Sequence, residues 1–257
     1  MTTLANAPLL EVLTEFRWGT RVPSDDNAVL FDHPPIEIET LFDRFAAVAA
    51  EIGFAFKQTT APESEPFTAS FGLRREAGGW PAYQIGIGTL SVHQANEGYD
   101  WPTYKRDVLT GVEMLRKSLA GVYDDIPFIG AEMVFVDAFF LDENETFKSF
   151  LLKNLRIKVR VPEAFLASRH LAPEPWSADF QVRCKLAEPE GWLTINVDSV
   201  DNLIGRRAVL MNTSVLSISS SVFASNAGCA GWLELAHLVQ RHAFKTVIQP
   251  AFQRSFA

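Results

Sequence analysis

The stretch LLEVLTEFRW, from Leu9 to Trp18, decides the fold, because apolar and charged side chains alternate along it. In a β-strand, successive side chains point to opposite faces of the sheet. One face therefore carries the apolar set and the other the charged set, which are Leu10, Val12, Phe16 and Trp18 against Glu11, Glu15 and Arg17. The pattern predicts a strand with one face on the core and one face turned away from it.

The segments after this strand indicate an α+β fold. Apolar residues at helical spacing predict a helix over residues 37–52, which Gly53 ends. Residues 67–76 and 82–95 are typical of two antiparallel strands around the turn AGGWP. A second helix follows, with Asp100 as its N-cap and Pro102 in its first turn, and residues 128–141 predict another strand. The order β-α-β-β-α-β is the ferredoxin-like arrangement.

The second half of the chain predicts a β-meander closed by a long helix. A short helix is expected at 145–155, strands at 156–161, 177–186, 191–200 and 207–222, and a last helix at about 232–252 with Glu234 and His237 on its polar face. We therefore expect antiparallel sheets with helices packed on one face. The loop at 141–145 suggests a ferredoxin-like half over 1–141 and a meander half over 142–257, and one continuous domain remains an alternative.

Composition favours a cytoplasmic protein. No apolar run approaches the roughly 20 residues of a membrane helix, and the N-terminus has no basic start, so we expect neither a membrane anchor nor a signal peptide. Cys184 and Cys229 are the two cysteines of the chain, and we expect both to be buried hydrophobic residues rather than disulfide partners or metal ligands.

Charge is distributed unevenly. Residues 1–130 contain 10 Lys and Arg against 18 Asp and Glu, whereas residues 131–257 contain 13 of each. The acidic half disfavours broad binding to a nucleic-acid backbone. A local basic cluster lies at 147–170, where strand alternation over 156–161 would place Arg156, Lys158 and Arg160 on one face. These residues are the candidate binding site for a partner rich in carboxylates or phosphates, although a plain solvated strand face explains them too.

Catalytic motifs are scarce in the sequence. It contains no phosphate-binding glycine loop, no nucleophile elbow and no HExxH zinc motif, and the glycines of GIG at 86–88 are expected inside a strand. His93, Tyr99 and Lys105 could form an acid–base cluster, and a polar strand end beside a helix cap explains the same residues. One Glu234-x-x-His237 pair on a polar helix face does not make a metal site. We expect no metal and no cofactor.

Three passages together resemble an uncharacterised, sporadically distributed prokaryotic family of about this length. They are ANAPLLEVLTEFRW, YDWPTYKRDV and LELAHLVQRHAFKTVI. The family pattern opens with a proline, an aliphatic residue and two glutamates four apart, as in Pro8, Leu9, Glu11 and Glu15. It continues with a Tyr-to-Trp step into a helix, and it closes on a helix with the spacing of Glu234 and His237. The resemblance implies a stand-alone protein, sometimes near mobile-element or defence genes, without assigned catalytic residues.

Three functions follow as hypotheses. The first is a non-enzymatic interaction protein whose acidic half binds a basic or nucleic-acid-handling protein. The second is an RNA-binding protein or metal-independent ribonuclease on tandem ferredoxin-like halves. His93, Tyr99 and Lys105 would be its candidate catalytic residues. The third is a small-molecule site between the aromatic-rich sheet and the final helix. The sequence leaves the oligomeric state open.

Overall fold

A computed structural model describes residues 8–22, 30–32, 36–59, 67–95, 98–123, 125–126, 128–158, 162, 179–218 and 226–256. Its strands are β1 (Leu9–Trp18), β2 (Thr20–Val22), β3 (Leu30–Asp32), β4 (Phe56–Thr59), β5 (Phe71–Arg74), β6 (Ala82–Gly86), β7 (Thr89–Ala95), β8 (Phe128–Phe140), β9 (Phe180–Leu186), β10 (Gly191–Leu203) and β11 (Arg206–Ile218). Its helices are α1 (Ile38–Ala50), α2 (Trp101–Ser118), α3 (Phe147–Asn154), α5 (Asn226–Val247), α6 (Pro250–Gln253) and the 3-10 turn η1 (Arg254–Phe256).

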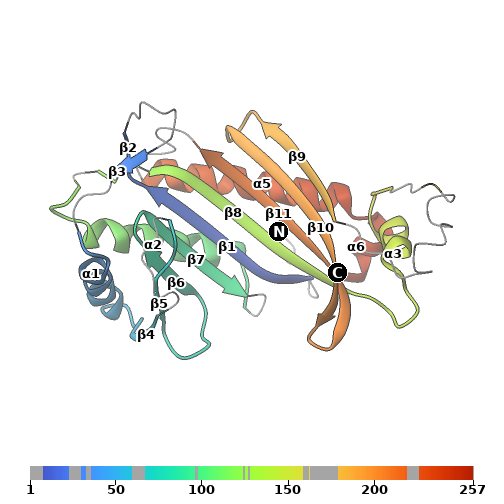
Figure 1. Ribbon diagram of the computed structural model, residues 1–257, viewed down its shortest axis with the longest axis horizontal. Coiled ribbons are helices and arrows are strands. Elements are labelled where there is room, and N and C mark those ends of the chain that lie inside the picture. The colour runs from blue at the N-terminus through green and yellow to red at the C-terminus, as the bar shows by residue number, and fades with distance from the viewer. Residues whose placement is uncertain are drawn as a thin grey trace.

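One antiparallel sheet of nine strands organises the molecule (Figure 1), in the order β4-β5-β6-β7-β1-β8-β11-β10-β9. β2 and β3 pair separately. Among the described strands, β4 and β9 form the two edges, so the sheet is open. The predicted α+β class is confirmed, and β9, β10 and β11 pair consecutively as a meander before α5.

β1 lies near the middle of the sheet and pairs antiparallel with both β7 and β8. The predicted alternation is confirmed for most of the strand, since Val12, Phe16 and Trp18 are buried. At its start, Leu9 is buried in place of Leu10, because an irregularity in the pairing with β8 between Leu9 and Glu11 shifts the alternation.

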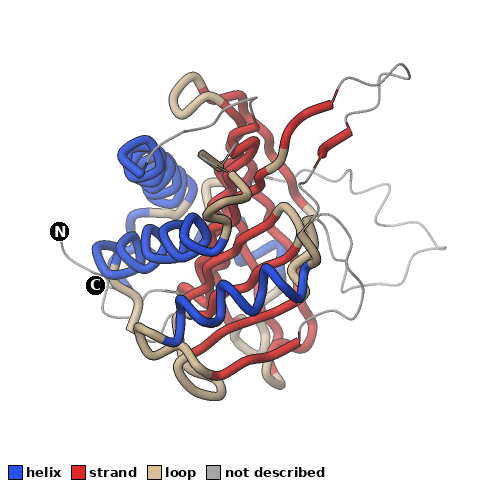
Figure 2. The backbone as a smooth tube through the Cα atoms, turned by 90° about the vertical axis from the view of Figure 1, so that its left-hand side faces the viewer, coloured by secondary structure: helices blue, strands red, loops and turns tan. Residues whose placement is uncertain are grey.

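Helices gather mainly on one side of the strands, as Figure 2 shows. The larger hydrophobic cluster joins residues of α1, α2 and α5 to the buried faces of β1, β7 and β8. The smaller cluster joins α3 and the end of α5 to β8, β10 and β11. β8 pairs with β11 as well as with β1, so one sheet continues through both predicted halves. No helix among the described residues is long and apolar enough to cross a membrane.

The start of α2 follows the prediction from its sequence. Asp100 accepts a hydrogen bond from the backbone N–H of Thr103 at 3.1 Å, and Pro102 lies in the first turn. Tyr104 then ties the helix to the sheet. Its hydroxyl donates to the carbonyl of Val92 at 3.1 Å and accepts from the hydroxyl of Thr14 at 2.8 Å. These buried hydrogen bonds attach α2 to β1 and β7.

Several predicted elements are corrected. Residues 82–95 form the hairpin β6–β7 and not one strand, because Gly88 turns the chain with a φ of 73°. Arg156 and Lys158 lie in backbone that is not a strand, while Arg160 lies outside the described residues. The last long helix begins at Asn226, and α6 is separate from it. Cys184 is exposed on the edge strand β9, whereas Cys229 is buried as expected.

Gly86 at the end of β6 provides a test of this architecture. A Cβ added there would lie 1.8 Å from the carbonyl oxygen of Thr68. Gly86→Ala must therefore move backbone, and we expect a loss of about 3 kcal/mol or more in the free energy of unfolding, measured by urea denaturation. Gly231→Ala on α5 is the control, because its new methyl group meets nothing within 4 Å. It should be neutral or stabilising, and equal losses in the two variants would contradict the packing described.

Candidate functional site

The fold separates the three predicted catalytic candidates. His93 lies on the face of β7 turned away from the helices, where its Nδ1 is 2.6 Å from Oε1 of Glu11. Tyr99 packs on the helix-covered side against Tyr104 and Phe135. Lys105 lies on α2 and bonds to α5. The sheet therefore stands between His93 and the other two residues, and the cluster predicted from His93, Tyr99 and Lys105 does not form.

The predicted basic stripe is not brought together on a strand. Leu155 makes an isolated bridge to Ile248, and Arg156 follows at a bend. Arg156 and Lys158 are exposed, and Arg160 lies outside the described residues. The strand geometry on which the stripe depended is absent from 156–158, so its role as a binding site stays a prediction.

The start of α2 and the middle of α5 meet in a polar and aromatic contact. Lys105 Nζ lies 2.7 Å from Oε1 of Glu234, and Trp101 Nε1 donates to Oε2 of the same carboxylate at 3.3 Å. The Lys105 hydrogen bond is the main cause that lowers the pKa of Glu234. The Trp101 ring stacks on the imidazole of His237, with centroids 3.9 Å apart and planes 10° from parallel. Glu234 and His237, expected on the polar face of the last helix, therefore contact α2 through Lys105 and Trp101.

The side chain of Phe135 on β8 lies between this contact and the sheet, and its aromatic ring contacts two of the surrounding side chains. Its ring lies 6.2 Å from that of Tyr99 and 6.0 Å from that of His237. Thr213 on β11 is its direct cross-strand partner. Asp137 is two residues further along β8 and therefore points to the same side of the sheet. Its negative charge contributes to raising the pKa of Tyr99. Tyr99 and His237 therefore contact the Phe135 ring, Thr213 is its cross-strand neighbour, and Asp137 is its neighbour along the same strand face.

Each of these four side chains has a buried polar atom without a hydrogen-bond partner among the described residues. The atoms are Tyr99 OH, Asp137 Oδ2, Thr213 Oγ1 and His237 Nδ1. Buried polar groups in native proteins are nearly always hydrogen-bonded, since leaving one unpaired costs about 1–3 kcal/mol. Several such atoms near one aromatic ring set this region apart from the remaining core. We call these four residues, with Phe135 and Trp101, the Asp137 site.

Burial controls the charges in the Asp137 site. Asp137 is 3% exposed, and desolvation raises its pKa to about 7. Burial lowers the pKa of His237 to about 4, so its imidazole is neutral near pH 7. Burial also raises the pKa of Tyr99, which keeps its phenol protonated. The site thus combines a carboxyl whose pKa is raised to about 7 with neutral hydrogen-bonding groups and aromatic side chains.

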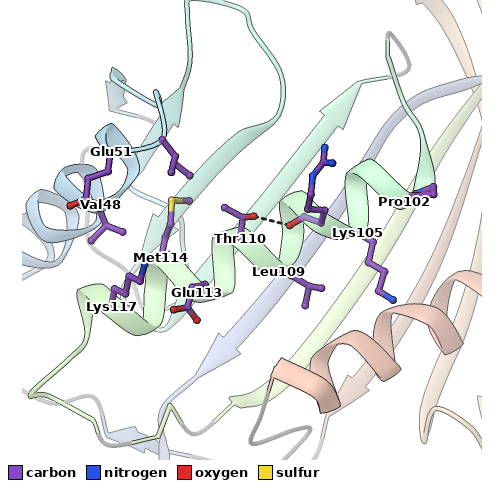
Figure 3. A pocket seen from close by; sticks show the side chains of 11 residues that line it. Val48, Glu51, Pro102, Lys105, Leu109, Thr110, Glu113, Met114 and Lys117 are labelled. Carbon is purple, nitrogen blue, oxygen red and sulfur yellow. Dashed lines mark hydrogen bonds between the residues drawn. The ribbon is translucent and has the colours of Figure 1, made fainter.

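A shallow groove of about 510 Å³ runs along the outer side of α2 (Figure 3). The end of α1 and the turn after it supply Val48, Glu51 and Ile52, and α2 supplies the remaining lining residues. Lys105 extends from the groove toward α5, as Figure 3 shows. The groove lining does not include the unpaired atoms of the Asp137 site, so the two features are distinct. Over the described ranges, no group of three or more His, Cys, Asp or Glu side chains could hold a metal ion.

Comparison with known proteins identified no family. No family model matches the chain, and a search of curated proteins found no match. The resemblance drawn from the three sequence passages therefore stays a prediction.

Sequence reasoning missed the centre of the site. Asp137 was visible as the single charge in the apolar run MVFVDAFFL, and such a residue on a buried strand is a signal of function or of a compensating partner. Thr213 and the inward side of His237 carried no such signal, because their positions depend on how β11 and α5 pack.

Asp137 should make stability depend on pH. Its ordinary pKa of 3.8 is raised to about 7 in the folded protein, so between these values the folded state holds a proton that the unfolded state releases. Its contribution to stability is full below the unfolded value and is lost as pH rises toward about 7. From about pH 5.5 to about pH 8, wild type should lose about 2 kcal/mol relative to Asp137→Asn. Urea denaturation at both pH values measures this difference.

Asp142→Asn, at an exposed position in the turn after β8, is the matched control. Its difference from wild type should stay constant between the two pH values. A constant difference for Asp137→Asn as well would show that the pKa of this carboxyl is not raised in the folded protein.

Proposed function

We propose that the protein binds a small organic cation, an amine or ammonium compound, at the Asp137 site. The observation that carries this proposal is the buried Asp137 carboxyl, whose Oδ2 has no partner among the described residues and whose charge acts to raise the pKa of Tyr99. This proposal makes the third hypothesis from the sequence more specific, since that hypothesis placed a small-molecule site between the sheet and the final helix.

The chemistry of the site suits a cation. A protonated amine donates hydrogen bonds to a carboxylate, and a quaternary ammonium group is attracted to it by charge alone. Both kinds of cation are attracted to aromatic faces such as those of Trp101, Tyr99 and Phe135. Thr213 and Tyr99 can accept hydrogen bonds from a ligand or donate them to it. A neutral His237 adds no repelling charge. An anion, by contrast, would meet Asp137 and Glu234.

The path to the site runs between α2 and α5. The Lys105–Glu234 pair is partly solvent-exposed, with side chains 23% and 47% exposed, and the Trp101–His237 stack connects the same two helices. Separation of these contacts would admit a ligand without moving β8 or β11. The ion pair at the boundary is weak enough to open, since exposed pairs contribute at most about 1 kcal/mol.

Choline and methylamine are the probes for this proposal. We expect either amine to raise the melting temperature of wild type and to bind about tenfold more tightly at about pH 8 than at about pH 6, because a cation selects the ionised carboxylate. Calorimetric titration and thermal melting measure both effects. The Asp137→Asn variant should show neither the rise in melting temperature nor the pH-dependent binding.

Two controls complete this experiment. The uncharged tert-butyl isostere of choline should not bind, and Asp198→Asn on β10 should respond as wild type does. Failure of both amines at either pH, or an undiminished response in Asp137→Asn, would refute the proposal.

A second candidate function is binding of a basic protein partner in the cytoplasm. This is the first hypothesis proposed from the sequence. The charge of the first 130 residues favours it, and the acidic residues described there include exposed Glu39 on α1 and exposed Glu51 after that helix. Complementary charge accelerates association and selects partners, and salt weakens it.

The partner hypothesis predicts a complex that salt disrupts. Tagged protein purified from its host at low salt should retain a basic protein that high salt removes, identified by mass spectrometry. Glu39→Lys with Glu51→Lys should weaken capture, whereas Asp142→Lys with Glu143→Lys, also exposed, should not. Co-purifying RNA instead would favour the RNA-binding alternative, and capture unaffected by salt would count against the electrostatic surface.

We propose further that the N-terminal part is a ferredoxin-like unit. The order β6-β7-β1-β8 supports this, because these four strands are antiparallel neighbours, α1 lies between β1 and β6 in the chain, and α2 joins β7 to β8. β4 and β5 would then be additions at its edge.

A further inference from the structure

The face of the sheet opposite the helices carries an ordered chain of hydrogen bonds across β1 and β7, the adjacent strands at the centre of Figure 1. Glu11 Oε1 lies 2.6 Å from His93 Nδ1, and His93 Nε2 lies 3.0 Å from the hydroxyl of Ser91. Ser91 and His93 share this face because they are two residues apart on β7. The chain is independent of the Asp137 site, which lies on the helix-covered side.

The order of the hydrogen-bond partners determines which atoms donate and which accept. A carboxylate only accepts hydrogen bonds, so the Glu11 contact places a proton on Nδ1 of His93. In the neutral imidazole, Nε2 then has a free lone pair and accepts the proton of the Ser91 hydroxyl. A serine, a base within hydrogen-bond reach and a carboxylate that orients the base make up the arrangement that activates a serine nucleophile.

The neighbours of Ser91 indicate the class of substrate. Gln84 on β6 lies directly opposite Ser91 on one side, and its amide can donate to an oxygen that becomes negative. On the other side, Glu15 is opposite Ser91, and Glu132 is opposite Glu15 on β8. Arg17 Nε lies 2.6 Å from Oε1 of Glu15, so the Arg17 cation stands against three carboxylates on this face, those of Glu11, Glu15 and Glu132. The negative balance of these four residues disfavours phosphates and other anions. Ser91 is only 5% exposed, so a substrate must be small as well as uncharged.

We propose that Ser91 and His93 are catalytic residues of an esterase for small uncharged esters, with Glu11 as a positioning residue. The Ser91 oxygen attacks the ester carbonyl while its proton passes to His93 Nε2. The carbon–alkoxy bond breaks, and the leaving alcohol takes that proton. Water then attacks the acyl-serine, gives a proton to His93, and releases the acid while Ser91 regains its proton. Gln84 donates to the carbonyl oxygen in both steps.

The test uses a small fluorophosphonate, an uncharged probe that forms a bond to an activated serine and releases fluoride. We expect labelling of the full-length protein at Ser91, located by peptide mass spectrometry, and hydrolysis of p-nitrophenyl acetate. Ser91→Ala should abolish both. His93→Gln should slow labelling by about 100-fold or more. Glu11→Gln should do likewise, because its amide donates to Nδ1 and leaves Nε2 protonated.

Ser214→Ala is the matched control. Ser214 lies on the same face, but its hydroxyl donates to Glu132 at 2.5 Å and not to a histidine, so this variant should be labelled as wild type is. Folding of each variant is checked by its melting temperature. Absence of label at Ser91 in folded wild type, or a rate unchanged in His93→Gln, would overturn the proposal and leave the chain of hydrogen bonds a structural one. Neither outcome bears on amine binding at Asp137.

Discussion

β1 is hydrogen-bonded along both of its edges, to β7 on one side and to β8 on the other, and this double pairing determines which side chains lie together. A slip of one residue would exchange the two faces of a strand. Val12 and Phe16 would leave the core, and Glu11 and Glu15 would enter it. Burial of the apolar set therefore holds the charged set on the opposite face, where Glu11 meets His93.

β8 extends this constraint across the sheet. Its helix-facing side supplies Phe135 to the larger hydrophobic cluster and Phe139 to the smaller one, with Asp137 between them. A carboxyl at this point is costly, as its raised pKa reflects. An apolar residue would join the two clusters into one continuous core. Buried groups with strongly shifted pKa values cluster at functional sites, which is why Asp137 is the centre of the proposed site.

The contact between α2 and α5 connects the two parts of the chain and also covers the Asp137 site. Tyr104 holds α2 on the sheet through buried hydrogen bonds, whereas the outer contacts of Lys105 and Trp101 with Glu234 are partly exposed. The inner attachment is therefore the stronger of the two, and movement at the outer one leaves the sheet intact.

Period-two and helical patterns in the sequence were sufficient for the α+β class, for β1 and for α2 with its Asp100 cap, because these features depend on neighbours along the chain. They also placed Glu11, Glu15 and Arg17 on the face away from the core. They could not show that His93 belongs with Glu11 and Ser91 while Tyr99 and Lys105 belong with His237 and Glu234. That division depends on strand pairing and helix packing between residues far apart in sequence. Only the tertiary structure decided which polar residues meet, because local periodicity specifies a face and not the partner that covers it.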